Sequence, residues 1–123
     1  MREGLIIVLP WPPKGLSPND RPSRWALARA KKQYRRSCAW AAVAAGARRL
    51  DADRLRVRVR FIPPNANVRD TDNMVASIKS GLDGVAEVIG VDDSRWDLVL
   101  APRGAPEPPG RVEVIIERRE VTQ

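Results

Sequence analysis

In Leu55-Arg56-Val57-Arg58-Val59-Arg60-Phe61, apolar side chains and arginines alternate without exception. Successive side chains of a strand point to opposite faces of its sheet, so this stretch predicts a strand with one apolar and one arginine face. The apolar face has to be covered by other elements, and we expect the arginine face to lie in solvent. Pro63 and Pro64 should end the strand, and a short extended segment should follow around Val68.

Before this strand, residues 23–45 predict a long helix that Ser23 or a neighbour caps and Gly46 stops. At about 100° per residue, one side of this helix carries the apolar residues that should face the core, which are Leu27, Ala30, Tyr34, Cys38, Ala41 and Ala45. Basic residues cover much of the remaining surface, namely Arg24, Arg29, Lys31, Lys32, Arg35 and Arg36. No acidic residue lies between Arg21 and Arg49. Like charges that lie four residues apart on a helix repel each other. Bound phosphates would therefore explain this basic surface better than solvent alone.

The remaining elements extend outward from these two. Residues 73–88 carry a helical apolar repeat that Gly90 should end, and residues 4–9, 97–101 and 111–117 read as strands. We therefore expect one domain over residues 1–123 with a polar tail at residues 118–123. Its fold class is α/β (α+β): a mixed sheet of about four to five strands packed by two main helices.

Composition and charge narrow the function. The 123 residues have a net charge of +7, no histidine and a single cysteine, Cys38. Residues 1–49 hold 11 basic and two acidic residues, whereas residues 50–123 hold 11 basic and 13 acidic residues. This separation favours a polyanion-binding surface beside a metal-binding one. The missing histidine excludes Ser-His-Asp and Cys-His catalysis and any zinc site built from histidine and cysteine.

The chain also lacks an apolar run long enough to span a membrane, and Pro10 interrupts the apolar stretch near the N-terminus. That stretch is too short for the core of a signal peptide, so we expect a cytoplasmic protein without a membrane partner.

The candidate catalytic and metal-binding residues are concentrated in Arg69-Asp70-Thr71-Asp72-Asn73 and in the segment after it. Two carboxylates that converge in one place favour a hard cation between them, and magnesium prefers such oxygen ligands together with phosphate oxygens. On one continuous helix, Asp72, Lys79 and Asp83 would fall on one stripe opposite the apolar residues. The alternative is structural, since aspartates are also common in turns and at helix caps. The pair Asp92-Asp93 has the same two interpretations.

The order of these motifs resembles the RusA-like crossover junction endodeoxyribonucleases of bacteriophages and prophages. The resemblance covers roughly residues 5–117 and rests on Leu9-Pro10-Trp11-Pro12-Pro13, Ser17-Pro18-Asn19-Asp20-Arg21, the basic helix, the Asp70–Asn73 motif, Lys79, Leu82-Asp83-Gly84 and Asp92-Asp93. Arg24 stands where many members of that family carry a histidine.

The resemblance implies a homodimer that resolves Holliday junctions by paired nicks with Mg²⁺, or with Mn²⁺ as a substitute, and without a nucleotide cofactor. By position it assigns catalysis to Asp70, Asp72, Asp93 and Lys79. Metal binding would use the same three aspartates, with Asp92 as a weaker candidate, and Asn73 and Asp83 would support them. The residues expected to contact DNA are Arg21, Arg24, Lys31, Lys32, Arg35 and Arg69.

Two other functions fit the sequence. One is a non-catalytic, basic DNA-binding protein whose acids serve only the fold. The other is a metal-dependent nuclease for flaps and other branched DNA, without a preference for four-way junctions.

Overall fold

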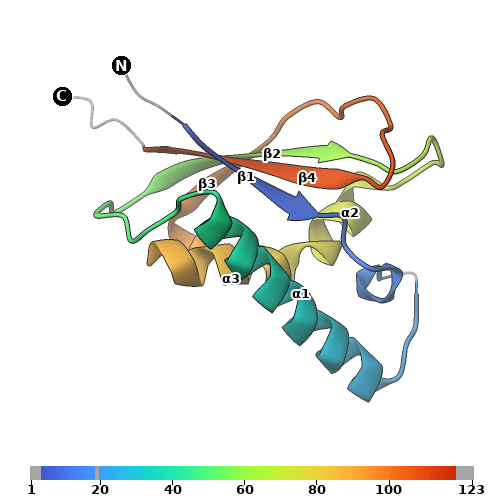
Figure 1. The fold of residues 1–123 in the computed structure, drawn as a ribbon. Coiled ribbons are helices and arrows are strands. Elements are labelled where there is room, and N and C mark those ends of the chain that lie inside the picture. Colours follow the sequence, from blue (N-terminus) through green and yellow to red (C-terminus); the bar gives the residue numbers. More distant parts are fainter. Residues whose placement is uncertain (1–3, 19, 119–123) are drawn as a thin grey trace.

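The fold is a four-stranded mixed sheet with its helices on one face, as the computed structural model shows for residues 4–18 and 20–118 (Figure 1). Its strands are β1 (Leu5–Pro10), β2 (Leu55–Ile62), β3 (Trp96–Leu100) and β4 (Arg111–Arg118). They lie in the order β1-β4-β2-β3, with β4 antiparallel to both neighbours and β3 parallel to β2. The predicted α+β class and strand count are confirmed. The tail prediction lies outside the described residues except at Arg118, whose backbone belongs to β4.

The helices cover the apolar face of the sheet (Figure 1). They are α1 (Arg24–Ala44), α2 (Thr71–Ser77) and α3 (Lys79–Ile89), with short 3-10 turns η1 (Lys14–Leu16) and η2 (Asp93–Arg95). The strand register aligns buried residues across the sheet, for example Ile7 and Val59 on either side of Val114. No helix among the described residues is long and apolar enough to cross a membrane.

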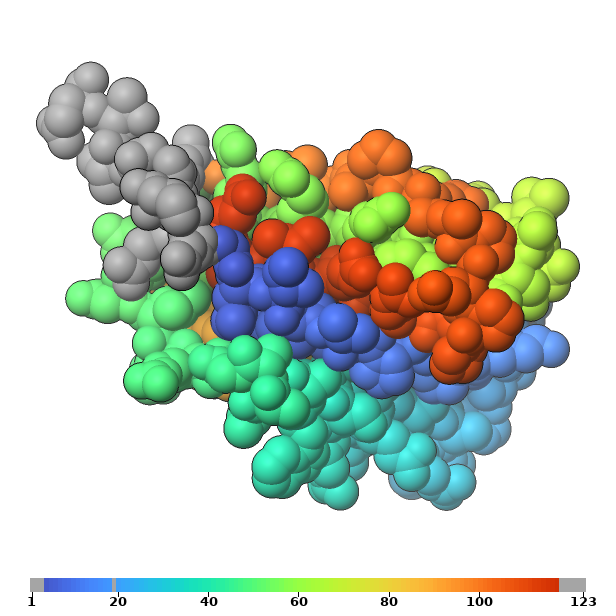
Figure 2. Space-filling view, turned by 45° about the horizontal axis from the view of Figure 1, so that its top comes forward, coloured from blue at the N-terminus to red at the C-terminus, as the bar shows by residue number. Residues whose placement is uncertain are grey.

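The predicted alternation of β2 is confirmed. Val57 and Val59 are fully buried, whereas the arginines point to the opposite face, which Figure 2 turns forward with β1 in blue and β4 in red. Glutamates of β4 stand among these arginines: Arg60 lies 3.5 Å from Glu113, and Arg58 lies 4.0 Å from Glu117. The outer face is therefore a solvated surface of mixed charge.

Helix α1 also follows the prediction. The Ser23 hydroxyl caps it by accepting a 3.1 Å hydrogen bond from the Ala26 N–H. Tyr34 and Cys38 are buried, and the Tyr34 hydroxyl donates a 2.7 Å hydrogen bond to the carbonyl of Pro10. Burial raises the pKa of the Cys38 thiol to about 12, so this thiol is neutral and belongs to the core.

The prediction of one helix over residues 73–88 was wrong in its continuity. The structure has α2 and α3 separated at Ile78, whose φ of −100° and ψ of 2° lie outside the helical range. The Ser77 hydroxyl donates a 2.8 Å hydrogen bond to the carbonyl of Asn73, one turn earlier, and such bonds often bend helices. Asp72 therefore does not share a single-helix stripe with Lys79 and Asp83.

Helix α3 packs against α1 at very short range. A Cβ atom added at Gly84 would lie 2.2 Å from the Arg35 carbonyl oxygen, and one added at Gly81 would lie 2.5 Å from the Tyr34 ring. Only glycine allows this approach, because any side chain at either position would collide with α1. The packing fixes the basic helix α1 relative to the residues that α3 carries.

Candidate functional site

Lys79 stands between two carboxylates at the start of α3. Its ammonium lies 2.5 Å from Asp93 Oδ2 and 3.2 Å from Asp83 Oδ1. Lys79 and Asp83 face each other as neighbours on a helix should, while Asp93 reaches them from η2. The hydrogen bond to Asp93 is the main cause that raises the Lys79 pKa above its ordinary value, so the side chain carries its charge at neutral pH.

Two other aspartates act as caps. Asp70 Oδ1 accepts a 2.8 Å hydrogen bond from the Asp72 N–H and caps α2. Asp92 Oδ2 accepts a 3.0 Å hydrogen bond from the Ser94 N–H and caps η2, and hydrogen bonding to Ser94 is the main cause that lowers the Asp92 pKa. The structural role that the sequence left open is thus real for both residues. Each cap bond uses one carboxylate oxygen, and the second oxygen can still take a ligand.

A metal site can be tested against this arrangement. Within residues 4–18 and 20–118, no three cysteine, aspartate or glutamate side chains are close enough to hold one ion together. The donors fit a hard cation in kind, because Asp70, Asp72 and Asp93 offer carboxylate oxygens and Asn73 offers an amide oxygen. In this structure the Lys79 ammonium already neutralises Asp93. A shared ion would therefore require the acids to move together and Asp93 to exchange its partner.

Basic residues of α1 line two cavities together with acidic residues of α3 and of the segment after it. A cavity of about 340 Å³ is lined by Lys31 from α1 together with Lys79 and Asp83. A second cavity, of about 370 Å³, is lined by Arg35 from α1 together with Asp83 and Asp92. Two residues expected to bind DNA therefore share cavities with Asp83.

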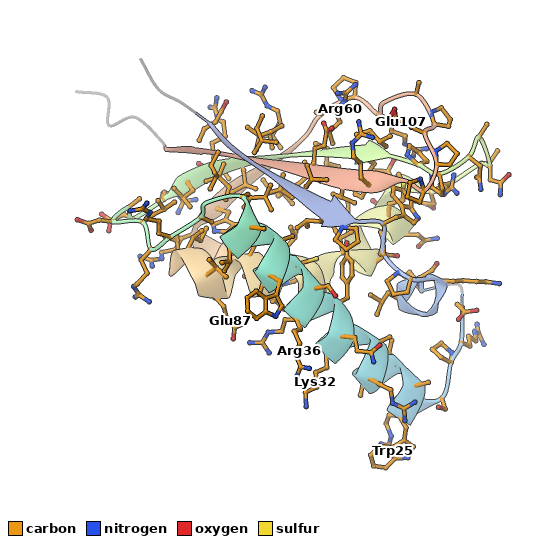
Figure 3. The ribbon with its side chains drawn as sticks, viewed as in Figure 1. Trp25, Lys32, Arg36, Arg60, Glu87 and Glu107 are labelled. Carbon is orange, nitrogen blue, oxygen red and sulfur yellow. The ribbon has the colours of Figure 1, made fainter. Side chains whose placement is uncertain are left out.

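The other basic residues of α1 point into solvent. Lys32 and Arg36 extend below α1, away from the sheet, whereas Arg60 and Glu107 project from the opposite side of the molecule (Figure 3). Arg35 pairs with Glu87 of α3. Arg24 is exposed at the start of α1, and Arg21 is exposed in the segment before it.

Arg69 occupies a different place from the other predicted DNA contacts. Its guanidinium lies over the Trp11 ring, 5.4 Å from the ring centre, and donates hydrogen bonds to the backbone carbonyls of Asn65 and Asn67 at 3.0 and 3.1 Å. It is thus held within the fold and is not part of the surface of α1.

Sequence reasoning missed Arg103, in the loop after β3. Its guanidinium donates hydrogen bonds to the Arg69 carbonyl at 2.9 Å and to the Thr71 hydroxyl at 2.8 Å. These bonds tie Arg103 to the residues on both sides of Asp70, at the start of α2. No local pattern marks Arg103, because its partners lie more than 30 residues earlier in the chain.

Comparisons with known proteins add one relative. The chain is similar to an uncharacterized protein of Xylella fastidiosa (strain Temecula1), with 39% identity over 93 residues. The match covers 73% of this chain and 61% of the relative, so the chain spans about three-fifths of that protein. No protein-family model matches the chain.

Proposed function

We propose that this protein is a magnesium-dependent endonuclease that resolves four-way (Holliday) junctions by paired nicks, as RusA-like enzymes do. The observation that carries the proposal is the meeting of opposite charges along α3. Lys31 of the basic helix lines one cavity with Lys79 and Asp83, and Arg35 lines another with Asp83 and Asp92. A phosphate held by α1 would come close to a lysine and several carboxylates, which are the groups that phosphodiester hydrolysis needs.

In this proposal, Asp70, Asp72 and Asp93 would move together and would hold Mg²⁺, or Mn²⁺ as a substitute. When bound, the ion supplies the charge that polarises the phosphodiester and its attacking water. Lys79 donates to the phosphate as negative charge builds on it, and Asp83 keeps the ammonium directed there. Asn73, one residue beyond Asp72, supports the acids, and no nucleotide cofactor takes part.

The basic surface of α1 binds the DNA backbone. Its exposed cations can neutralise phosphates on several strands without reading their sequence. This role suits a nuclease that recognises the branched form of its substrate. Such a nuclease would work in the cytoplasm of a bacterium, encoded by the host or by a phage.

Paired nicks call for two copies of the chain. A four-way junction has two equivalent strands, and each chain offers one set of proposed metal ligands. A two-fold homodimer would therefore match the symmetry of the substrate. Sedimentation at micromolar concentration should give twice the 13.7 kDa chain mass. A monomer that still makes paired nicks would overturn this part of the proposal.

A non-catalytic DNA-binding protein is the main competing function. The caps formed by Asp70 and Asp92 favour it, because both acids already have a structural role as helix caps. A nuclease for flaps is the second alternative, and it shares the whole proposed chemistry. Cutting separates the first alternative from the proposal, and substrate preference separates the second.

The decisive experiment incubates the purified protein with a synthetic four-way junction, a flap and a linear duplex of matched sequence. Each substrate is tested with Mg²⁺, with Mn²⁺ and with EDTA, and the products are separated on denaturing gels. We expect metal-dependent, symmetric nicks in the junction, with slower cutting of the flap and duplex. Binding without cutting would establish the non-catalytic alternative, and faster cutting of flaps would establish the second.

A further inference from the structure

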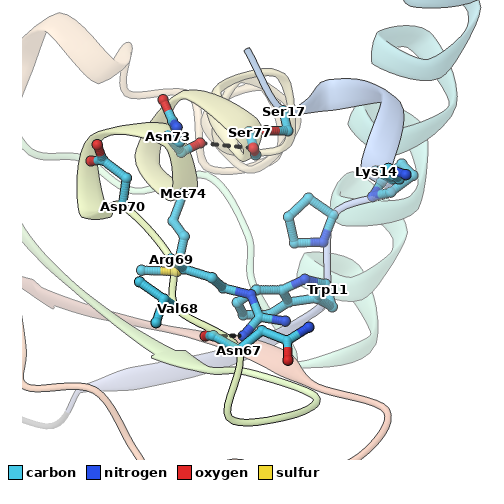
Figure 4. Close-up of a pocket in the computed structure, with 12 residues that line it drawn as sticks. Trp11, Lys14, Ser17, Asn67, Val68, Arg69, Asp70, Asn73, Met74 and Ser77 are labelled. Atoms are coloured by element: carbon cyan, nitrogen blue, oxygen red, sulfur yellow. Dashed lines mark hydrogen bonds between the residues drawn. The ribbon is translucent and has the colours of Figure 1, made fainter. Parts of the chain in front are cut away.

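A separate cavity lies beside Asp70. It has a volume of about 450 Å³ and lies between the segment after β1 and the start of α2 (Figure 4). Its walls combine the Trp11 ring, the Arg69 guanidinium and the Met74 side chain with polar groups. Asp70, a proposed metal ligand, is among the residues that line it.

The flat wall of this cavity is held in place from several directions. Arg69 lies over Trp11 and donates to Asn65 and Asn67, including a 2.8 Å bond from its second nitrogen to Asn65 Oδ1. Behind it, the Trp11 ring meets the Phe61 ring edge-on, with 6.1 Å between their centres. This cation–π pair presents a planar surface. Because the fold already holds both side chains in place, a ligand that stacks on this surface does not lose affinity by immobilising them.

Polar side chains line the cavity around this wall. The side-chain amides of Asn67 and Asn73 have no hydrogen-bond partner among the described residues, and each offers a donor and an acceptor. Lys14 adds a cation at the rim, with no ion pair to any residue in the described part of the chain.

We propose that this cavity binds one unstacked nucleobase of the DNA substrate. The base would lie against the Trp11–Arg69 pair, its edge would meet the amides of Asn67 and Asn73, and Lys14 would face the adjoining phosphate. Proteins bind unstacked bases by this combination of a planar aromatic or guanidinium surface and hydrogen bonds to the base edge. The inference rests on the proposed function, because it places the base next to the strand that Asp70 would help to cut.

The chemistry of the walls favours a base over a purely apolar ligand. Amides, a hydroxyl at Ser77 and two cations would gain no hydrogen bond from an apolar occupant, and burying them beneath one would be costly. A free nucleotide carries the same chemistry as a base within DNA, so the experiment has to distinguish these two sources.

The test measures binding in EDTA, so that it does not depend on cutting. A labelled four-way junction and a set of copies with one abasic site, moved stepwise through the nucleotides nearest the branch point, are titrated with protein. The variants are Trp11→Leu, which removes the ring but keeps apolar bulk, and Trp25→Leu as a matched control, because Trp25 is an exposed tryptophan of α1 (Figure 3). Free deoxynucleoside monophosphates are added as competitors.

We expect one abasic position to weaken wild-type binding by about tenfold, which is a typical effect of removing one stacked base. Trp11→Leu should weaken binding to the intact junction by a similar factor and abolish the abasic effect, whereas Trp25→Leu should keep that effect. A flat abasic scan with the wild-type protein would overturn the proposal, whether or not Trp11→Leu folds. If free nucleotides compete in a Trp11-dependent way while the scan is flat, the cavity binds free nucleotides and the DNA source is wrong.

The two proposals fail separately. Protein that never nicks a junction but shows the abasic effect would refute the nuclease and keep the base site. Protein that nicks junctions with a flat scan would refute only the base site.

Discussion

The molecule has two arginine-rich surfaces that differ in their acidic partners. On the outer face of the sheet, Arg60 of β2 stands directly opposite Glu113 of β4, and Arg58 lies near Glu117. On α1, the only ion pair among the described residues is that of Arg35 with Glu87. The sheet sets glutamates beside its arginines, whereas most cations of α1 have no acidic partner among the described residues.

The difference shows where a polyanion would bind. A phosphate on the sheet face would meet glutamates beside the arginines, so attraction and repulsion would largely cancel. A phosphate on α1 would meet cations that repel one another until it arrives. Placing the proposed site on the α1 side therefore follows from the distribution of acids, and the first three of the following predictions each set residues on that side against matched residues elsewhere.

The largest expected effect is the loss of cutting in Asp72→Asn. Removing the carboxylate charge takes away a proposed metal ligand, so the nicking rate should fall at least about 100-fold, while junction binding should be kept or tightened. Gel assays of nicking and binding on the same protein would measure both. Asp97→Asn is the matched control, because Asp97 lies on β3 and pairs with Arg54, and the variant should keep its activity. Strong metal-dependent cutting by Asp72→Asn would remove this residue from the site.

The next effect concerns the two arginine surfaces directly. Replacing Lys31, Lys32 and Arg35 by alanine should weaken binding to every DNA on the order of 100-fold. The log–log salt slope should fall by about 2.7, which is about 0.9 for each phosphate that the protein no longer neutralises. Replacing Arg56, Arg58 and Arg60 by alanine removes the same charge from the sheet and should leave the slope nearly unchanged. Equal salt slopes for the two triple variants would show that the difference between the two surfaces does not affect DNA binding.

A third prediction tests the packing that holds α1 against α3. Gly84→Ala would push a methyl group into the Arg35 carbonyl and should lower the free energy of unfolding by about 3 kcal/mol. Gly15→Ala is the control, because nothing lies within 4 Å of an added Cβ atom there, and its stability should change little. Urea denaturation measures both, and similar stabilities for the two variants would contradict the close approach.

The smallest effect concerns the charge of Lys79. Because its carboxylate partners raise its pKa in the folded state, its stabilising contribution is present below the unfolded value of 10.5 and is lost as the pH rises through the folded value. Its side chain is 62% exposed, so Lys79→Met should cost less than about 1 kcal/mol at pH 7. Urea denaturation at about pH 7 and about pH 11, on either side of the ordinary lysine pKa, should show the stability difference between the wild type and Lys79→Met shrinking. A stability difference that grows with pH would contradict a raised pKa of Lys79 in the folded state.

Several elements could be predicted because their signals are local. The alternation of β2 and the cap at Ser23 need only neighbours in the chain, and both appear where expected. The break at Ile78 was not predicted, because helical spacing of apolar residues continues across it and the Ser77 hydroxyl can point either to solvent or to the preceding turn. The assignments of Asp70, Asp72, Asp93 and Lys79 to catalysis stay predictions, since the structure shows two caps and an ion-paired cluster.

The sequence by itself determined the element types, the apolar faces, the absence of histidine chemistry and the uneven distribution of charge, because composition and periodicity are properties of the chain. Only the tertiary structure decided which charges meet. It brought Arg35 into one cavity with Asp83 and Asp92, placed Arg58 and Arg60 of β2 beside glutamates of β4, and set Arg69 over Trp11. Those contacts join residues tens of positions apart, and their partners are chosen by the packing of α1 on α3 and by the register of the strands.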